Sequence, residues 1–212
     1  MSYVVYGDLR SGAFSSEAAL AEAGVSYEFH TVPLEQNAQK APEFLAINPT
    51  GKMPALKLPG GEIMTESAAI LLTIAERHPD AGLLPPPASF GRARCYRWIA
   101  YLASEVYPMV EISDYPERFA PLGEAAVALR RKAKARIRER LLVLEKTIAG
   151  PWLLETGFSA ADIYLANFSR WRNSIGREWL AEGHIPKITA LAEAVSQRPL
   201  IAPVWARHFG RD

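Results

Sequence analysis

The fold is decided by Asn48-Pro-Thr-Gly-Lys-Met-Pro-Ala-Leu56, a stretch in which a Gly-Lys turn leads through Met53 and Pro54 into a short apolar run. Proline has no backbone donor and is tolerated at strand starts, edges and bulges, so a strand is predicted to begin directly after Pro54. If the bond between Met53 and Pro54 is cis, the backbone N–H and C=O of Met53 face outward instead of joining the sheet. They then offer an open edge to an extended peptide.

A second motif, Glu66-Ser-Ala-Ala-Ile70, lies ten residues downstream. We expect a short strand over 62–64 before it and a helix that begins at Thr65 or Glu66. The unpaired N–H groups and the dipole of a helix N-terminus attract a carboxylate, here across Glu66 and Ser67. The Glu66 side chain can pair with an ammonium group. Together these groups predict recognition of one end of an amino acid.

The first part of the chain, residues 1–78, has the spacing of a mixed α/β domain. Apolar and β-branched runs predict strands, and residues at helical spacing predict the helices between them. The expected elements are a strand at 3–6, a helix at 15–23, a strand at 25–32, a short helix at 42–47, strands at 55–58 and 62–64, and a helix at 66–77. A helix between the first two strands implies that they are parallel, with a right-handed crossover. The order βαβαββα resembles the thioredoxin-like arrangement.

The rest of the chain carries no strand signal, and residues 89–212 are predicted to form an all-α helical bundle. The segment 79–88, rich in proline, is predicted to be the linker. Ser159 and Asp162 have the spacing of a capping box, and their expected role is folding. Apolar residues at helical spacing predict helices at 90–111, 124–149, 163–171, 185–195 and 198–209, with interruptions at the prolines of the first.

The two motifs, together with the chain length and the order of elements, are similar to the glutathione-binding half of the glutathione S-transferase superfamily. In the helical part the resemblance is confined to the capping box. In that family the residue before the cis-proline pairs with the cysteinyl backbone of glutathione, a Glu-Ser pair holds the γ-glutamyl end, and a lysine lies near the glycyl carboxylate. The resemblance therefore implies that glutathione, as co-substrate, contacts Lys52, Met53, Pro54, Glu66 and Ser67. The structural alternative for Lys52 is an exposed turn residue.

The resemblance also implies that a hydroxyl group stabilises the glutathione thiolate. A free cysteine thiol has a pKa of about 8.5, so a charge-assisted hydrogen bond and a helix N-terminus are needed to hold the ionised form at neutral pH. Ser11 is the first candidate, because Arg10-Ser-Gly12 resembles the serine- or cysteine-type turn of bacterial members. Tyr6 is the second, because Tyr6-Gly-Asp-Leu-Arg10 resembles the turn of tyrosine-type members, and Ser15 is the third. Ser11 as a helix cap and Tyr6 as a core residue are the structural alternatives.

The implied activity is that of a glutathione transferase, in which the thiolate attacks a small hydrophobic electrophile. Tyr107, Tyr115 and Trp171 can line the acceptor pocket, although aromatic residues at helical spacing also serve as core. A glutathione-dependent isomerase, peroxidase or dehalogenase is the first alternative. A non-catalytic binding module is the second, because residues 12–14 are Gly-Ala-Phe where many bacterial members have a cysteine or serine. The resemblance further implies a homodimer.

The composition of the chain argues against nucleic acid, an anionic membrane and a metal ion as binding partners. The formal net charge of +1 creates no overall field for nucleic acid or an anionic membrane, and the basic residues within 130–140 are predicted to form a solvated helix face. The histidines lack metal-ligand spacing, so no metal is expected, and the single Cys95 excludes an internal disulfide and is predicted to pack rather than react. The sequence shows neither a membrane-length apolar run nor a leader pattern, which predicts a soluble, cytoplasmic protein.

Overall fold

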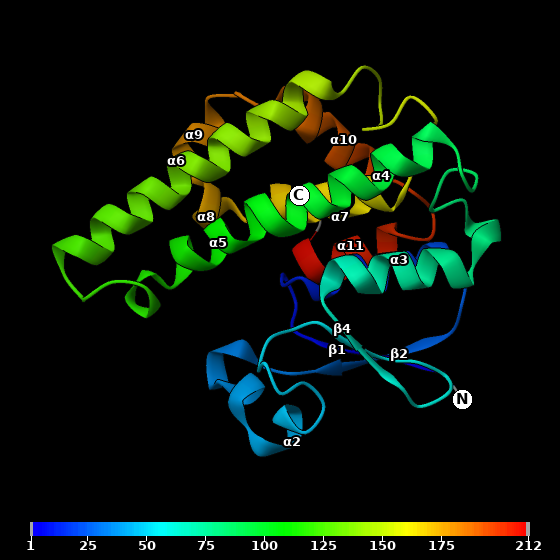
Figure 1. Cartoon of the computed structure of the whole chain (residues 1–212), viewed down its shortest axis with the longest axis horizontal. Coiled ribbons are helices and arrows are strands. Elements are labelled where there is room, and N and C mark those ends of the chain that lie inside the picture. The colour runs from blue at the N-terminus through cyan, green and yellow to red at the C-terminus, as the bar shows by residue number, and fades with distance from the viewer. Residues whose placement is uncertain (1, 211–212) are drawn as a thin grey trace. The chain divides into compact units, whose positions relative to one another are not determined.

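The structure, a computed structural model, describes residues 2–210 of the chain. These residues form two compact units. The first contains the residues up to Pro85 together with those from Ala194 onward, and the second runs from Pro86 to Glu193. Figure 1 shows the helices and strands of both units, most of them labelled.

The first unit is built on a four-stranded mixed sheet with the strand order β2-β1-β3-β4. β1 runs parallel to β2, whereas β3 is antiparallel to both β1 and β4. The elements up to Arg77 are β1 (Tyr3–Gly7), α1 (Ala13–Glu22), β2 (Tyr27–Thr31), α2 (Pro42–Leu45), β3 (Ala55–Lys57), β4 (Ile63–Thr65) and α3 (Ser67–Arg77). Their order confirms the predicted βαβαββα fold.

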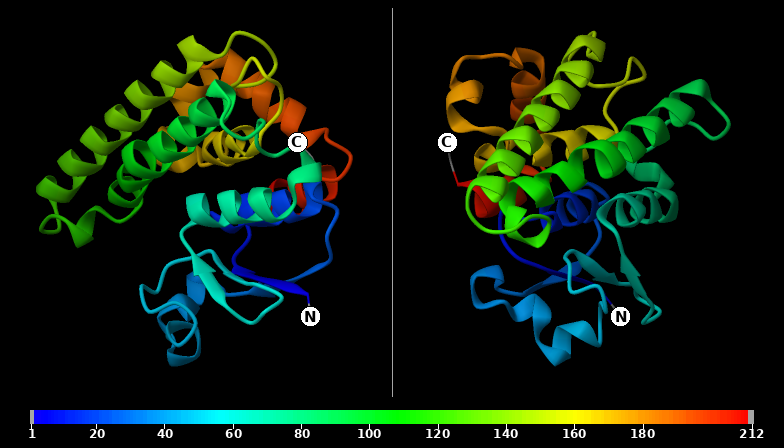
Figure 2. Two further views of the ribbon diagram at one scale, coloured as in Figure 1. Left: turned by 45° about the vertical axis from the view of Figure 1, so that its right-hand side comes forward. Right: turned by 60° about the vertical axis from the view of Figure 1, so that its left-hand side comes forward.

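Helices α1 and α3 cover one face of this sheet, and the short α2 lies on the other side, as Figure 2 shows. Along β1, Tyr3, Val5 and Gly7 are buried, whereas Val4 and Tyr6 on the alternate face are half-buried. A side chain at Gly7 would collide with the Cβ atom of Ala13. Glycine at this position therefore lets α1 approach the end of β1, which brings the first turn of the helix close to the sheet.

The C-terminal helix α11 (Ala202–Phe209) belongs to the first unit and packs on α1. The ring centroids of Trp205 and Phe209 lie 5.4 Å and 4.9 Å from that of Phe14. The helical region predicted at 89–212 therefore differs from the compact helical unit, which ends at Glu193. An amphipathic pattern shows that a helix buries one face, but it does not show which partner covers that face.

The second unit is helical, and its described residues contain no strand. Its helices are α4 (Phe90–Tyr101), α5 (Tyr107–Asp114), α6 (Glu124–Thr147), α7 (Ala160–Ser169), α8 (Arg172–Ile175), α9 (Arg177–Ala181) and α10 (Pro186–Ser196), the last of which continues into residues of the first unit. α7 is buried along almost its whole length and forms the centre of this unit. The backbone N–H of Ser159 donates to the carboxylate of Asp162 at 2.8 Å, which confirms the predicted capping box.

The long helix predicted at 90–111 is interrupted where the prolines indicated. A π-helical segment, Leu102–Val106, joins α4 to α5, and Pro108 lies in the first turn of α5. Proline supplies no N–H and its ring crowds the preceding turn. The wider π-helical turn accommodates this change without ending the helical path.

Candidate functional site

The strand register brings three chain segments to one end of the sheet in the first unit. Tyr6 near the end of β1 pairs with Ala55 at the start of β3, and Ala55 pairs with Thr65 at the end of β4. The chain after β1, the chain before β3 and the chain after β4 therefore leave the sheet at the same end. We call this end the candidate site; its segments are the turn 8–12, residues 52–54 and residues 66–67.

Residues 52–54 lead into β3 through a cis peptide bond between Met53 and Pro54, the geometry considered in the sequence analysis. The β3 ladder begins at Ala55, so Met53 precedes the paired residues. Met53 is half-buried, Pro54 is buried and Lys52 is exposed. The segment thus combines a cis peptide bond directly before the first paired residue of β3 with a cationic side chain that reaches solvent.

Asn48 holds the loop that carries Lys52, a role that the sequence analysis missed. The residue is 2% exposed, its Nδ2 donates to the carbonyl of Lys52 at 2.6 Å, and its Oδ1 accepts from the backbone N–H of Thr50 at 3.1 Å. A buried amide that bonds the backbone on both sides fixes the path of a loop. The Asn-Pro at the start of the motif was the available signal.

Glu66 and Ser67 form the boundary between β4 and α3. Glu66 adopts φ 64° and ψ 108°, a left-handed conformation that is uncommon for a residue with a side chain. Such backbone strain persists where the surrounding structure enforces it, and it is frequent at binding sites. Ser67, the first residue of α3, is 5% exposed, whereas Glu66 is exposed. The first turn of α3 carries no acidic residue, and the acidic Glu66 stands directly before it at the N-cap.

Ser11 lies in the turn between β1 and α1 and is bonded on both sides. Its Oγ donates to the carbonyl of Asp8 at 2.6 Å and accepts from the backbone N–H of Ala13 at 3.1 Å. The Asp8 carboxylate in turn accepts from the backbone N–H groups of Leu9 and Leu34, each at 2.8 Å. Ser11 is thus a turn-forming residue in the structure, and its only hydroxyl proton points to Asp8.

The other two candidate hydroxyls have different surroundings. Ser15 is fully buried in α1, and its Oγ donates to the carbonyl of Gly12 at 2.8 Å. Tyr6 is half-buried on the face of β1 opposite to Val5, and its ring centroid lies 5.3 Å from that of His30. Ser11 and Ser15 therefore share one helix start, whereas Tyr6 stands on the other face of the strand.

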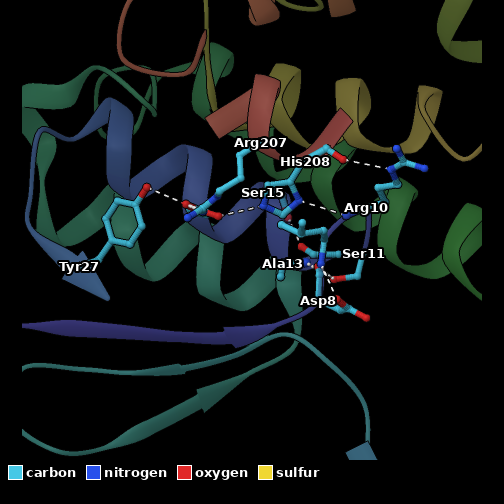
Figure 3. A network of polar contacts seen from close by, with 11 residues as sticks. Asp8, Arg10, Ser11, Ala13, Ser15, Tyr27, Arg207 and His208 are labelled. Carbon is cyan, nitrogen blue, oxygen red and sulfur yellow. Dashed lines mark hydrogen bonds and ion pairs between the residues drawn. The ribbon is translucent and has the colours of Figure 1, made fainter. Parts of the chain in front are cut away.

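A buried polar network ties the turn 8–12 to α1 and α11, and Figure 3 shows it. At its centre is Glu17 of α1, which is fully buried and accepts from the hydroxyl of Tyr27 at 2.8 Å and from Nε2 of His208 at 2.8 Å. The guanidinium of Arg207 also pairs with this carboxylate. Nδ1 of His208 accepts from the backbone N–H of Arg10 at 3.2 Å. This network was not predicted from the sequence, although a glutamate within an alanine-rich helix was a signal.

The aromatic residues proposed for an acceptor pocket lie in the second unit. The ring centroids of Tyr107 and Trp171 are 5.1 Å apart, and that of Phe168 is 4.7 Å from Trp171. Tyr107 and Trp171 are therefore brought together. Tyr115 is 39% exposed and instead lies beneath the guanidinium of Arg118, whose Cζ is 3.9 Å from the ring centroid.

Three further observations concern Cys95, metal binding and membrane-spanning helices. Cys95 is buried, and burial raises the pKa of its thiol, which disfavours the nucleophilic form. Among residues 2–210 no group of three His, Cys, Asp or Glu side chains is arranged to hold a metal ion. In the same part of the chain, no helix has both the length and the apolar character needed to cross a membrane.

Comparison with known families and proteins finds consistent matches over both parts of the chain. The family models for the N-terminal and C-terminal domains of glutathione S-transferase match residues 16–77 and 101–199. An uncharacterised GST-like protein of Escherichia coli K12, YncG, is 32% identical over 206 residues, which is 96% of this chain and 97% of that protein. Maleylacetoacetate isomerase of Rhizobium meliloti is 32% identical over 150 residues, 70% of this chain and 69% of its own length.

Solved structures give the same family name. A glutathione transferase homologue from Sulfitobacter, crystallised with bound glutathione, aligns with a TM-score of 0.87 at 27% identity. The alignment covers 97% of this chain and 98% of that chain. The likeness therefore extends over both compact units.

Proposed function

This chain belongs to the glutathione S-transferase superfamily, and from that premise we propose that it is a glutathione transferase. The observation that carries the proposal is the strand register, because it brings the turn 8–12, Met53 and the start of α3 to one end of the sheet. A peptide-like ligand at that end meets a backbone edge, a helix N-terminus and a hydroxyl within one small region. The relative from Sulfitobacter, with the same fold, binds glutathione.

We assign the recognition of glutathione to the two motifs. The cysteinyl backbone lies antiparallel to Met53 beside Pro54, and the γ-glutamyl carboxylate lies over the first N–H groups of α3 at Ser67. Glu66 is exposed and carries the charge that an ammonium group requires. Lys52 is exposed on the loop fixed by Asn48 and is the partner for the glycyl carboxylate.

We assign the stabilisation of the thiolate to Ser11. The backbone N–H of Ala13 already donates to the Ser11 oxygen, and a hydroxyl that accepts one hydrogen bond becomes a stronger donor. Rotation about the C–O bond moves the hydroxyl proton from the Asp8 carbonyl to a sulfur anion at the start of α1. The sulfur proton is released to water, and the helix dipole adds to the stabilisation. Tyr6 is the alternative donor and approaches from the other face of β1.

The thiolate then attacks an apolar electrophile. A sulfur lone pair forms the new S–C bond, and the leaving group departs with the electrons of the bond that breaks. We propose that the paired rings of Tyr107 and Trp171 pack on the apolar part of this second substrate, with Tyr115 at its edge. Removal of reactive small molecules, a cytoplasmic location and a homodimer are parts of the same proposal.

A glutathione-dependent isomerase is the second candidate. A relative that covers 70% of this chain is named maleylacetoacetate isomerase, and isomerisation uses the same activated thiol. The two candidates differ in the fate of glutathione, because an isomerase releases it unchanged while a transferase consumes it. Glutathione balance during turnover therefore separates them.

The proposed function is tested by calorimetric binding of glutathione, followed by conjugation of a chromogenic aryl halide. Glu66→Gln should weaken glutathione binding about tenfold or more, because it removes the charge opposite the ammonium group. Glu62→Gln is the matched control, since Glu62 is also exposed and precedes β4 on the same hairpin. Equal affinity of both variants, or absence of glutathione binding by the wild type, would overturn the proposal.

A further inference from the structure

Arg10 has a backbone conformation that its own sequence does not favour. Its φ is 62°, in the left-handed region that favours glycine, and it directly precedes Ser11 in the turn 8–12. A side chain in this region is strained unless surrounding contacts hold it. The hydrogen bonds of Ser11 to Asp8 and Ala13 close the turn from within, and contacts from outside it add to the support of Arg10.

The contacts that hold Arg10 come from His208, far away in the sequence on α11. The backbone N–H of Arg10 donates to Nδ1 of His208 at 3.2 Å, and Nε of Arg10 donates to the carbonyl oxygen of His208 at 3.3 Å. His208 is 1% exposed. One residue of the C-terminal helix thus binds both the main chain and the side chain of the strained residue, as Figure 3 shows.

Glu17 determines which way the His208 ring faces. Because Nδ1 accepts a hydrogen bond, the proton of the neutral ring is on Nε2, which donates to the buried carboxylate of Glu17 at 2.8 Å. The hydroxyl of Tyr27 and the guanidinium of Arg207 also bind Glu17. The Glu17 carboxylate therefore has other hydrogen-bond and ion-pair partners besides His208. The bond from His208 to Arg10 is not needed to satisfy Glu17.

Burial, together with the neighbouring positive charge of Arg207, keeps the His208 ring neutral. Burial, reinforced by the positive charge of Arg207, lowers the pKa of His208 to about 4, while Asp8 acts weakly in the opposite direction. Arg10 adds a second guanidinium on the side of the turn, and Glu17 accepts from Nε2. At neutral pH the ring thus has a free lone pair on Nδ1 for the N–H of Arg10.

We propose that His208 is a positioning residue for glutathione activation: through Arg10 it holds the turn so that the Ser11 hydroxyl stands at the start of α1. This inference rests on the proposed function and extends it, because it makes the C-terminal helix part of the thiol-activating machinery. We therefore expect glutathione to bind without His208, whereas activation of its thiol requires His208.

Two substitutions separate the two bonds of the ring. In His208→Asn the side-chain oxygen stands where Nδ1 was and can still accept from Arg10, while the donor to Glu17 is lost. In His208→Gln the side-chain nitrogen stands where Nε2 was and can still donate to Glu17, while the acceptor for Arg10 is lost. Both variants remove the same imidazole ring and therefore share the cost of lost packing. They differ in whether an acceptor for the backbone N–H of Arg10 remains.

The decisive readout is the pKa of the thiol of bound glutathione, followed by its thiolate absorbance in the ultraviolet. We expect His208→Gln to raise this pKa by about one unit and lower kcat about tenfold, with the Kd for glutathione little changed. His208→Asn should keep values near those of the wild type. Hydrogen exchange at the Arg10 amide should speed up in His208→Gln and stay slow in His208→Asn.

Arg198→Gln is the matched control, because the Arg198 guanidinium pairs with Glu22 and so joins the same C-terminal segment to the other end of α1. It should lower stability without changing the thiol pKa. If His208→Gln keeps the wild-type thiol pKa while Ser11→Ala raises it, the positioning role is wrong and the proposed function stands. If the wild-type protein binds glutathione without lowering its thiol pKa, the positioning role is wrong together with the assigned activation. If His208→Asn and His208→Gln raise the thiol pKa and lower kcat equally, His208 has only a packing role, and the proposal is overturned.

Discussion

Ser11 donates its hydroxyl proton to the backbone carbonyl of Asp8, at 2.6 Å, while its oxygen accepts from Ala13. The residue that the sequence singles out for catalysis is therefore also a turn-forming residue. The two roles are compatible, because only the proton has to change partner when a thiolate arrives. They are also separable by experiment, because a structural bond affects folding and a catalytic bond affects the thiol.

Ser11→Ala should affect both properties. Loss of the bonds at the helix start should lower the free energy of unfolding by about 0.5 to 2 kcal/mol. Loss of the donor should raise the thiol pKa of bound glutathione toward the ordinary value of about 8.5. Ser15→Ala removes a comparable hydroxyl bond to the carbonyl of Gly12 and should lower stability alone. Urea unfolding and thiolate absorbance measure the two effects. An unchanged thiol pKa in Ser11→Ala would contradict the role of Ser11 and favour Tyr6 as the donor.

Asn48→Ala should weaken glutathione binding without changing the thiol pKa. The substitution removes the bonds to the backbone of Lys52 and Thr50, so the loop before Met53 loses its fixed path. We expect a Kd about tenfold higher, measured by calorimetry, which corresponds to about 1.4 kcal/mol. Thr50→Val, which removes only the hydroxyl bond to Asn48, is the milder control. Wild-type affinity in Asn48→Ala would show that the loop does not contact glutathione.

His208 should make the protein less stable in acid. Its pKa is lowered to about 4 in the folded chain, against an ordinary value of 6.5. The stabilising contribution is therefore complete above pH 6.5 and is lost as the pH falls toward 4, because the unfolded chain then binds the proton more strongly. Between these limits the wild type should lose about 3 kcal/mol relative to His208→Gln in urea unfolding. A constant difference between the two proteins would contradict this pKa.

Asp162 should make the protein less stable as the pH rises, which is the opposite of the effect of His208. Burial raises its pKa from 3.8 to about 6, although the backbone N–H groups of Leu153 and Ser159 favour the charged form. The folded chain then binds the proton more strongly than the unfolded chain, so this contribution is present below about pH 4 and is lost as the pH rises through 6. Relative to Asp162→Asn, the wild type should lose about 3 kcal/mol over that range. Carbon NMR of the carboxyl group, with a midpoint near the raised value, checks the same claim without a substitution.

The sequence was sufficient for elements whose signal is local. The proline after Met53, the Ser159 to Asp162 spacing and the apolar run of β1 each specify their structure through neighbouring residues. The capping box and the order βαβαββα follow from these patterns and are present in the structure, and the cis bond that the sequence left open is present as well. Register then brings the two motifs proposed to bind glutathione to one end of the sheet.

Long-range contacts could not be predicted from those patterns. The bond between Arg10 and His208 spans 198 positions, and the sequence around either residue does not indicate the other as its partner. The strain at Arg10 and Glu66 is a tertiary effect, since neither residue favours a left-handed backbone. For the same reason the placement of α11 on α1 escaped a pattern that shows only an apolar face.

The proposed function depends on one extended tripeptide that binds at the end of the sheet. The most direct test is a crystal structure of the protein soaked with glutathione. We predict that the cysteinyl backbone pairs with Met53, the γ-glutamyl end lies at Glu66 and Ser67, and the sulfur lies within hydrogen-bond distance of the Ser11 hydroxyl. Glutathione bound elsewhere, or a sulfur atom directed away from the turn 8–12, would contradict the account.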